Sequence, residues 1–119
     1  MQYALLLYDD EDAWDAAPET EQRDVISAHM AYTQALKDVG AYIGGEPLHH
    51  SRLAKTLRTR DGRLHVEDGP FTDSKEQLGG FYVIEAKDLD AALDWAALCP
   101  AASYGRIEVR PVFTVPAGA

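Results

Sequence analysis

The sequence predicts an α+β sandwich of ferredoxin-like type, in which two helices cover one face of a mainly antiparallel sheet. Three observations carry this prediction. Strand-like segments open and close the chain, a long helical pattern follows the first of them, and a second helical pattern precedes the last. With 119 residues the chain is long enough for one such domain, residues 1–119, and too short for two ordinary ones.

The first part of the chain predicts a strand and a long helix. Residues 2–8 are apolar on both parities, which is typical of a strand covered on both faces. The acidic run that follows is interpreted as a solvated loop leading to a helix at about residues 18–39, which Pro18 opens and Gly40 closes. The predicted buried stripe of this helix consists of Val25, His29, Tyr32, Leu36 and Val39.

The middle of the chain predicts an edge strand and a hairpin. Residues 41–48 contain two glycines and a proline, which favours a short, irregular edge strand. Residues 53–60 and 63–67 flank Asp61-Gly62, a dipeptide that tolerates positive φ and therefore predicts a tight hairpin turn.

The last third of the chain predicts a loop, a strand, a helix and a final strand. Residues 69–80 are interpreted as a loop and residues 81–86 as a strand. Asp88 is a typical cap for a second helix, which ends at Pro100, and residues 106–115 alternate as a strand with one buried face. The predicted buried stripe of the second helix consists of Leu89, Ala92, Leu93 and Ala96.

Charge and cysteine content exclude several classes of partner. The net charge is −9, which repels nucleic acid backbones and anionic membranes, so we expect neither as a partner. The single cysteine, Cys99, forms no internal disulfide and is interpreted as a packing residue, and the start has no basic-then-apolar leader. We therefore expect a cytoplasmic protein. His49 and His50 are adjacent on a strand and point to opposite faces, so we expect no metal and no cofactor.

The apolar residues of residues 2–8 and 81–86 also predict an assembly. Because both parities are apolar, the sheet face without helices is expected to be covered as well. The simplest cover is a second copy of the chain, so we expect a homodimer.

Several motifs resemble those of a known family. The run Asp68-Gly69-Pro70-Phe71-Thr72-Asp73-Ser74-Lys75-Glu76, followed by Gly79-Gly80-Phe81 and later by Glu108-Val109-Arg110-Pro111-Val112, resembles the signature of the DGPF proteins of the YCII-related superfamily. The resemblance spans the chain. It implies a bacterial dimeric α/β barrel, with the sheets of two chains facing each other around a cleft. Most members of that family have no assigned reaction, and a few relatives look like dehydrochlorinases.

The resemblance singles out His29. In the wider superfamily a histidine, proposed as catalytic, precedes a glycine by eleven residues, and His29 and Gly40 match that spacing. The aspartate that pairs with this histidine in the superfamily precedes a proline after the second helix, where this chain has Cys99. Asp73 and Glu76 of the signature loop are the substitutes that we expect to pair with His29 as catalytic residues. The other interpretation of His29, a core histidine held by a hydrogen bond, stays open.

Three further residues are candidates for ligand binding. Arg58 shares one face of the predicted hairpin with two neighbouring polar residues, and it is either a clamp for a carboxylate or a solvated side chain. Lys75 is a second candidate for holding an anion, and Asp68 of the signature either contacts a ligand or serves the turn.

Two functions follow. The first is a cofactor-free lyase or isomerase that acts on a small anionic or carbonyl compound through a cleft histidine. The second is a non-catalytic small-molecule-binding or regulatory module linked to an extracytoplasmic-function sigma factor, because some genes of the resembling family lie near such factors.

Overall fold

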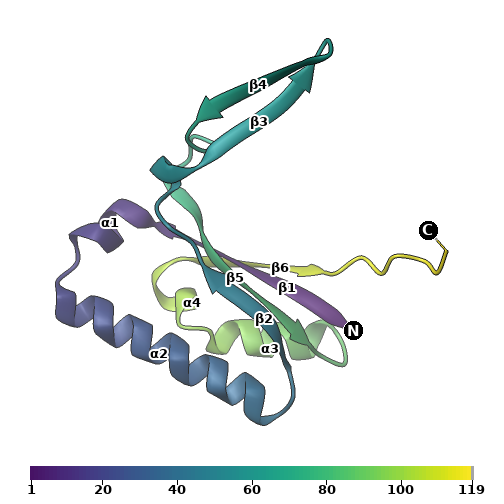
Figure 1. The fold of residues 1–119 in the computed structure, drawn as a ribbon. Helices are drawn as coiled ribbons and strands as arrows, with labels where there is room; N and C mark the ends of the chain where they lie inside the picture. Colours follow the sequence, from purple (N-terminus) through teal and green to yellow (C-terminus); the bar gives the residue numbers. More distant parts are fainter. Residues whose placement is uncertain (119) are drawn as a thin grey trace.

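The computed structural model describes residues 1–118 and has the predicted ferredoxin-like architecture (Figure 1). A four-stranded antiparallel sheet has the order β2-β5-β1-β6, and helices cover one of its faces. No helix among these residues has the length and apolar character needed to cross a membrane. The elements in chain order are β1 (Gln2–Asp10), α1 (Glu11–Ala16), α2 (Glu19–Asp38), β2 (Tyr42–Pro47), the short 3₁₀ helix η1 (Ser51–Leu53), β3 (Lys55–Arg60), β4 (Arg63–Asp68), β5 (Glu76–Glu85), α3 (Leu89–Leu98), α4 (Ala101–Tyr104) and β6 (Arg106–Pro111).

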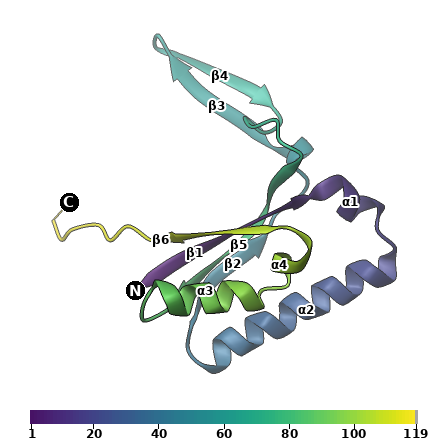
Figure 2. The ribbon, with the colours of Figure 1, turned by 180° about the vertical axis from the view of Figure 1, so that it is seen from behind.

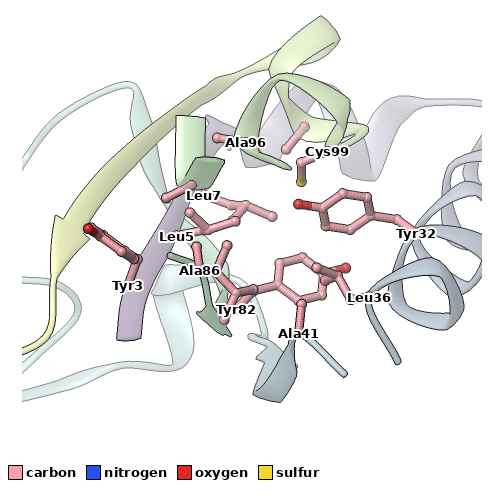
Figure 3. Packing of buried hydrophobic residues seen from close by; sticks show 13 residues of the cluster. Tyr3, Leu5, Leu7, Tyr32, Leu36, Ala41, Tyr82, Ala86, Ala96 and Cys99 are labelled. Carbon is pink, nitrogen blue, oxygen red and sulfur yellow. The ribbon is translucent and has the colours of Figure 1, made fainter. Parts of the chain in front are cut away.

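The core lies between the sheet and the helices. Because side chains alternate along a strand, Leu5 and Leu7 of β1 point to the helices while Leu6 points to the other face. Figure 3 shows Tyr32 and Leu36 of α2 packed towards these strand residues. Leu5 and Leu36 are fully buried, so the long helix is held to the middle of the sheet.

The two predicted helix stripes are only partly correct. Tyr32 and Leu36 are buried, but Val39 is 67% exposed because α2 ends at Asp38 and Val39 lies in its cap. In α3 the buried residues are the small ones, whereas Leu89 and Leu93 are nearly half exposed. Alanines at the contact allow α3 to pack closely on the sheet.

Two short α-helices, α1 and α4, and the 3₁₀ helix η1 were not predicted. The acidic run contains α1, whose N-cap Asp10 accepts a hydrogen bond from the Ala13 backbone N–H at 3.1 Å. Acidic residues in a first helical turn are favoured by the helix dipole, so the run that suggested a loop suits a helix start. The helix α4 begins directly after Pro100, which ends α3 as predicted but also opens the next helix.

The predicted hairpin is confirmed, and it stands away from the main sheet. Its turn residues Asp61 and Gly62 have φ angles of 51° and 74°, and Arg58 pairs with His65 across the ribbon. Figures 1 and 2 show this two-stranded ribbon, β3–β4, projecting from the body as an arm. The strand β5 begins at Glu76, inside the expected loop, and β6 ends at Pro111 rather than at residue 115.

Candidate functional site

A pocket of about 690 Å³ lies on the helix-covered side of the molecule. Its walls come from α1, α2, the end of β1, β2, β5, α4 and the segment around η1. Its volume is in the range of small-molecule sites. The polar side chains that line it include Asp9, His29, Thr33, Tyr82 and Tyr104.

His29 is the centre of a hydrogen-bonded triplet in this pocket. Its Nδ1 lies 2.9 Å from the Tyr82 hydroxyl, and its Nε2 lies 2.7 Å from the Tyr104 hydroxyl. The His29 and Tyr82 rings are stacked with an interplanar angle of 17°, while the Tyr104 ring meets the imidazole edge-on. Burial lowers the pKa of His29 below its ordinary 6.5, so the imidazole is neutral at pH 7.

Three elements bring this triplet together. His29 belongs to the stripe of α2 that faces the sheet, as the sequence predicted. Tyr82 pairs with Leu5 in the β1–β5 register and therefore points to the helices. Tyr104 is the last residue of α4, and Gly105 after it passes so close to β1 that a Cβ there would lie 2.1 Å from the Tyr8 carbonyl oxygen.

A carboxylate that the sequence analysis did not single out lies beside Tyr104. Asp9 follows Leu7 by two residues on β1, so it shares the helix-covered face. Burial raises the pKa of Asp9, and the neighbouring charges of Glu11 and Asp10 add to the rise. Burial also raises the pKa of Tyr104, and the charge of Asp9 raises it further. The alternation of residues 3, 5, 7 and 9 along β1 was the signal that could have found Asp9.

The glycine that faces Asp9 keeps this part of the pocket open. A Cβ on Gly79 would lie 2.8 Å from Asp9 Oδ1, so a larger residue there would displace the carboxylate. Gly79 is the extra residue of β5 at the register shift opposite Leu7 and Tyr8. The Gly79-Gly80 pair of the signature therefore serves the pocket through its small size.

The structure does not bring Asp73 or Glu76 to His29, because both ring nitrogens are bonded to tyrosines. Glu76 pairs with Asp10 in the β1–β5 register, and alternation places both on the sheet face without helices. There the Glu76 carboxylate lies 3.1 Å from Arg106 Nε. The sheet itself thus separates Glu76 from His29, and Asp73 is an exposed residue of the preceding loop.

The three predicted ligand-binding residues also lie outside this pocket. Arg58 is exposed on the arm, and Asp68, at the end of the same ribbon, pairs with Lys55. Lys75 Nζ lies 3.6 Å from Asp10 Oδ2, on the far side of the sheet. These positions favour the alternative interpretation of Arg58 as a solvated side chain.

Lys37 and Arg52 line the pocket, and each contacts another lining residue. Lys37 Nζ lies 5.1 Å from the centre of the Tyr42 ring, and Arg52 Nη1 lies 3.4 Å from Asp15 Oδ2. The Arg52 side chain is 64% exposed. At His29 the structure gathers two tyrosine hydroxyls, and Asp9 lies beside one of them, Tyr104.

Comparison with known proteins gives three findings. The YCII-related domain family matches residues 1–116. The chain is 39% identical over 114 residues to the uncharacterized protein R00369 of Rhizobium meliloti (strain 1021), covering 94% of this chain and 92% of that protein. Its fold is similar to that of 5-chloro-2-hydroxyhydroquinone dehydrochlorinase (TftG) from Burkholderia phenoliruptrix AC1100, solved in complex with 2,5-dihydroxybenzoquinone. That similarity has a TM-score of 0.51 and 23% identity, and it covers 95% of this chain and 94% of the other.

Proposed function

The chain belongs to the YCII-related domain family, and we propose that it is a cofactor-free lyase or isomerase that moves a proton on a small carbonyl or anionic compound. The observation that carries this proposal is the neutral His29 imidazole, held between two tyrosine hydroxyls in a pocket of small-molecule size. The two hydroxyls satisfy both ring nitrogens, so it is the position of this group in the wall of a pocket that favours a functional role over a purely structural one.

The groups in this pocket suit proton transfer. A neutral imidazole accepts a proton at one nitrogen and donates one at the other. The raised pKa of Asp9 moves this carboxyl towards the range in which it exchanges protons near neutral pH, as a general acid or base requires. Proton donor and acceptor thus lie on one wall of the same pocket.

The structural neighbour supports the same class of reaction. TftG is a dehydrochlorinase by name, and loss of hydrogen chloride from a carbon skeleton includes the loss of a proton. Its complex contains 2,5-dihydroxybenzoquinone, a cyclic compound with carbonyl and hydroxyl groups. We propose a compound of similar size for this chain.

The assembly that we propose is a homodimer that covers the sheet face without helices. Ala4, Leu6, Phe81 and Val83 share that face by strand register, and an apolar sheet face gains from being covered. Light scattering on a sizing column should give about twice the chain mass of 13.1 kDa. A monomer at low micromolar concentration would contradict this assembly.

The test of the proposed activity uses 2,5-dihydroxybenzoquinone as a probe. Its ring C–H groups exchange for deuterium in D₂O through a keto tautomer, and proton NMR measures the rate. We expect the protein to accelerate this exchange, and His29→Gln to reduce the acceleration by about tenfold, because the imidazole links the two tyrosine hydroxyls of the pocket. The matched control is His65→Gln, the same change on the exposed arm, which should keep the wild-type rate.

The second candidate function, a non-catalytic binding or regulatory module, predicts a different result. It is favoured by Cys99, which occupies the place of the superfamily aspartate. Saturable binding of the probe without acceleration of exchange would contradict the enzyme and favour the module.

A further inference from the structure

We infer that the Tyr104 hydroxyl is the group that meets the substrate, as a hydrogen-bond donor to a carbonyl or enolate oxygen, and that His29 acts through it as a positioning residue. This inference rests on the proposed function and assigns the substrate-contacting role within the same pocket.

Neither ring nitrogen of His29 is free to contact a substrate. Both ring nitrogens are within 3 Å of a tyrosine oxygen. Because burial lowers the pKa of His29, the ring is neutral, so one nitrogen carries a hydrogen and the other accepts one. One tyrosine must therefore donate to the imidazole and the other must accept from it.

The burial of Tyr82 determines which of the two tyrosines donates to His29. Tyr82 is only 8% exposed, and its hydroxyl lies 2.9 Å from His29 Nδ1, which accepts its hydrogen when that nitrogen carries none. If Nδ1 instead carried the hydrogen, the buried Tyr82 O–H would lose this acceptor, and buried donors are costly to leave unpaired. Burial raises the pKa of Tyr82, so its hydroxyl stays protonated near neutral pH and needs an acceptor.

The Tyr104 hydroxyl accepts from His29 and remains able to donate its own hydrogen. With Tyr82 donating to Nδ1, the Nε2–H of His29 donates to the Tyr104 oxygen, and the hydrogen of Tyr104 is free to point elsewhere. Tyr104 lines the pocket and is 42% exposed. Burial and the charge of Asp9 raise the pKa of Tyr104, so its hydroxyl stays protonated near neutral pH and acts as a donor. The hydrogen bonds from Tyr82 to His29, from His29 to Tyr104 and from Tyr104 to the substrate then all run in one direction, and each strengthens the next.

The kind of donor at His29 indicates the class of substrate. At His29 the hydrogen-bond donor that faces the pocket is the Tyr104 hydroxyl, whereas Arg52 of the pocket wall lies 3.4 Å from Asp15. Such a donor suits a carbonyl, enolate or phenolate oxygen better than a carboxylate, which arginine binds in a bidentate manner.

The proposed reaction needs only the substrate, Asp9 and Tyr104. The Asp9 carboxylate takes a proton from the carbon next to the carbonyl, and the C–H electron pair forms a C=C bond. The carbonyl oxygen becomes negative and accepts the hydrogen bond of Tyr104. Return of the proton from Asp9 to a different carbon completes an isomerisation, and departure of a leaving group completes an elimination.

The experiment uses 4-nitrophenol, whose phenolate mimics an enolate oxygen and whose absorbance reports its ionisation. We expect the wild type to bind it through the Tyr104 hydroxyl, which favours the phenolate form, whereas burial and the charge of Asp9 oppose it; the absorbance of the bound form is therefore compared between wild type and variants. Tyr104→Phe, which keeps the ring, should weaken binding by about tenfold, the effect of losing one hydrogen bond to a charged group. Tyr3→Phe is the matched control: its hydroxyl contacts Met1 Sδ in the core, away from the pocket, so binding should not change.

A spectroscopic measurement tests the positioning role of His29. In His29→Gln, bound 4-nitrophenol should remain closer to its neutral form than in the wild type, because the donor chain behind Tyr104 is interrupted. A residue with a purely structural role would change the stability of the fold and leave the spectrum of the bound form unchanged.

The outcomes separate this inference from the proposed function. Wild-type affinity and an unchanged spectrum in Tyr104→Phe would overturn the inference, and so would a wild type that binds no 4-nitrophenol at millimolar concentration. The deuterium-exchange assay decides the enzyme independently. Loss of 4-nitrophenol binding in Tyr104→Phe without any catalysed exchange would retain Tyr104 as the ligand's donor and reject the enzyme.

Discussion

Gly105 passes close to β1 and thereby holds the preceding residue, Tyr104, at the pocket. Replacing Gly105 by alanine tests whether this close contact is needed for stability. In Gly105→Ala the new Cβ would lie 2.1 Å from the Tyr8 carbonyl oxygen and 3.1 Å from Asp9 Cβ. Since no real Cβ contact is that short, the backbone of α4 or of β1 must move. Overpacking of this kind costs about 1–3 kcal/mol. With a urea m-value of about 1–3 kcal/mol/M, the unfolding midpoint should fall by roughly 1 M.

The matched control is Gly44→Ala in the edge strand β2. A Cβ on Gly44 would meet no atom within 4 Å, and Gly44 has no positive φ. Its free energy of unfolding should therefore stay within about 0.5 kcal/mol of the wild-type value. Urea denaturation followed by far-UV circular dichroism, at one protein concentration, measures both variants. Equal midpoints for the two variants would refute the reasoning, because only the contact at Gly105 distinguishes them.

Four further predictions concern the pocket and one helix cap. Tyr82→Phe leaves His29 Nδ1 without its donor, so the free energy of unfolding should fall by about 1–3 kcal/mol in urea titrations. The folded-state pKa of His29 lies below its unfolded value of 6.5, so the unfolded chain binds more protons in that window. Thermal stability should thus fall as the pH drops below 6.5, and less steeply in His29→Gln. The folded-state pKa of Asp9 lies above 3.8, so its charge destabilises the fold at pH 7. Asp9→Asn should then raise the melting temperature at pH 7, lose this gain below pH 3.8 and slow the deuterium exchange. Asp88→Ala removes the side-chain cap of α3, at 2.9 Å from the Ala91 N–H, and should cost about 1 kcal/mol.

Much of the fold could be predicted because local signals agreed with the packing. The apolar residues of both parities in β1 and β5 indicated central strands, and these two strands do pair at the centre of the sheet. The Asp61-Gly62 dipeptide and the Asp88 cap each depend on the conformation of a few residues, which the sequence states directly. Such features need no knowledge of distant contacts.

The partners of His29 could not be predicted in the same way. The α2 stripe correctly placed His29 towards the sheet, but choosing a carboxylate required knowing which face Glu76 occupies. That face depends on the register of β5 against β1, including the shift between Leu7 and Tyr8, and no local pattern reveals it. Tyr104 was hidden for a different reason: Pro100 indicated the end of a helix, although proline equally suits the start of the next one.

The burial of Cys99 gives a physical reason why the carboxylate that we propose as the base is Asp9 rather than a residue at position 99. Cys99 is 2% exposed, and burial raises the pKa of its thiol, so the residue is uncharged where it packs near Tyr32 (Figure 3). A carboxylate at that depth without a cation would be costly to ionise. Asp9, at the end of β1, is only partly buried and lies beside Tyr104. The acid–base chemistry that we propose for this chain therefore uses a carboxylate at the pocket wall, which is compatible with a cysteine at position 99.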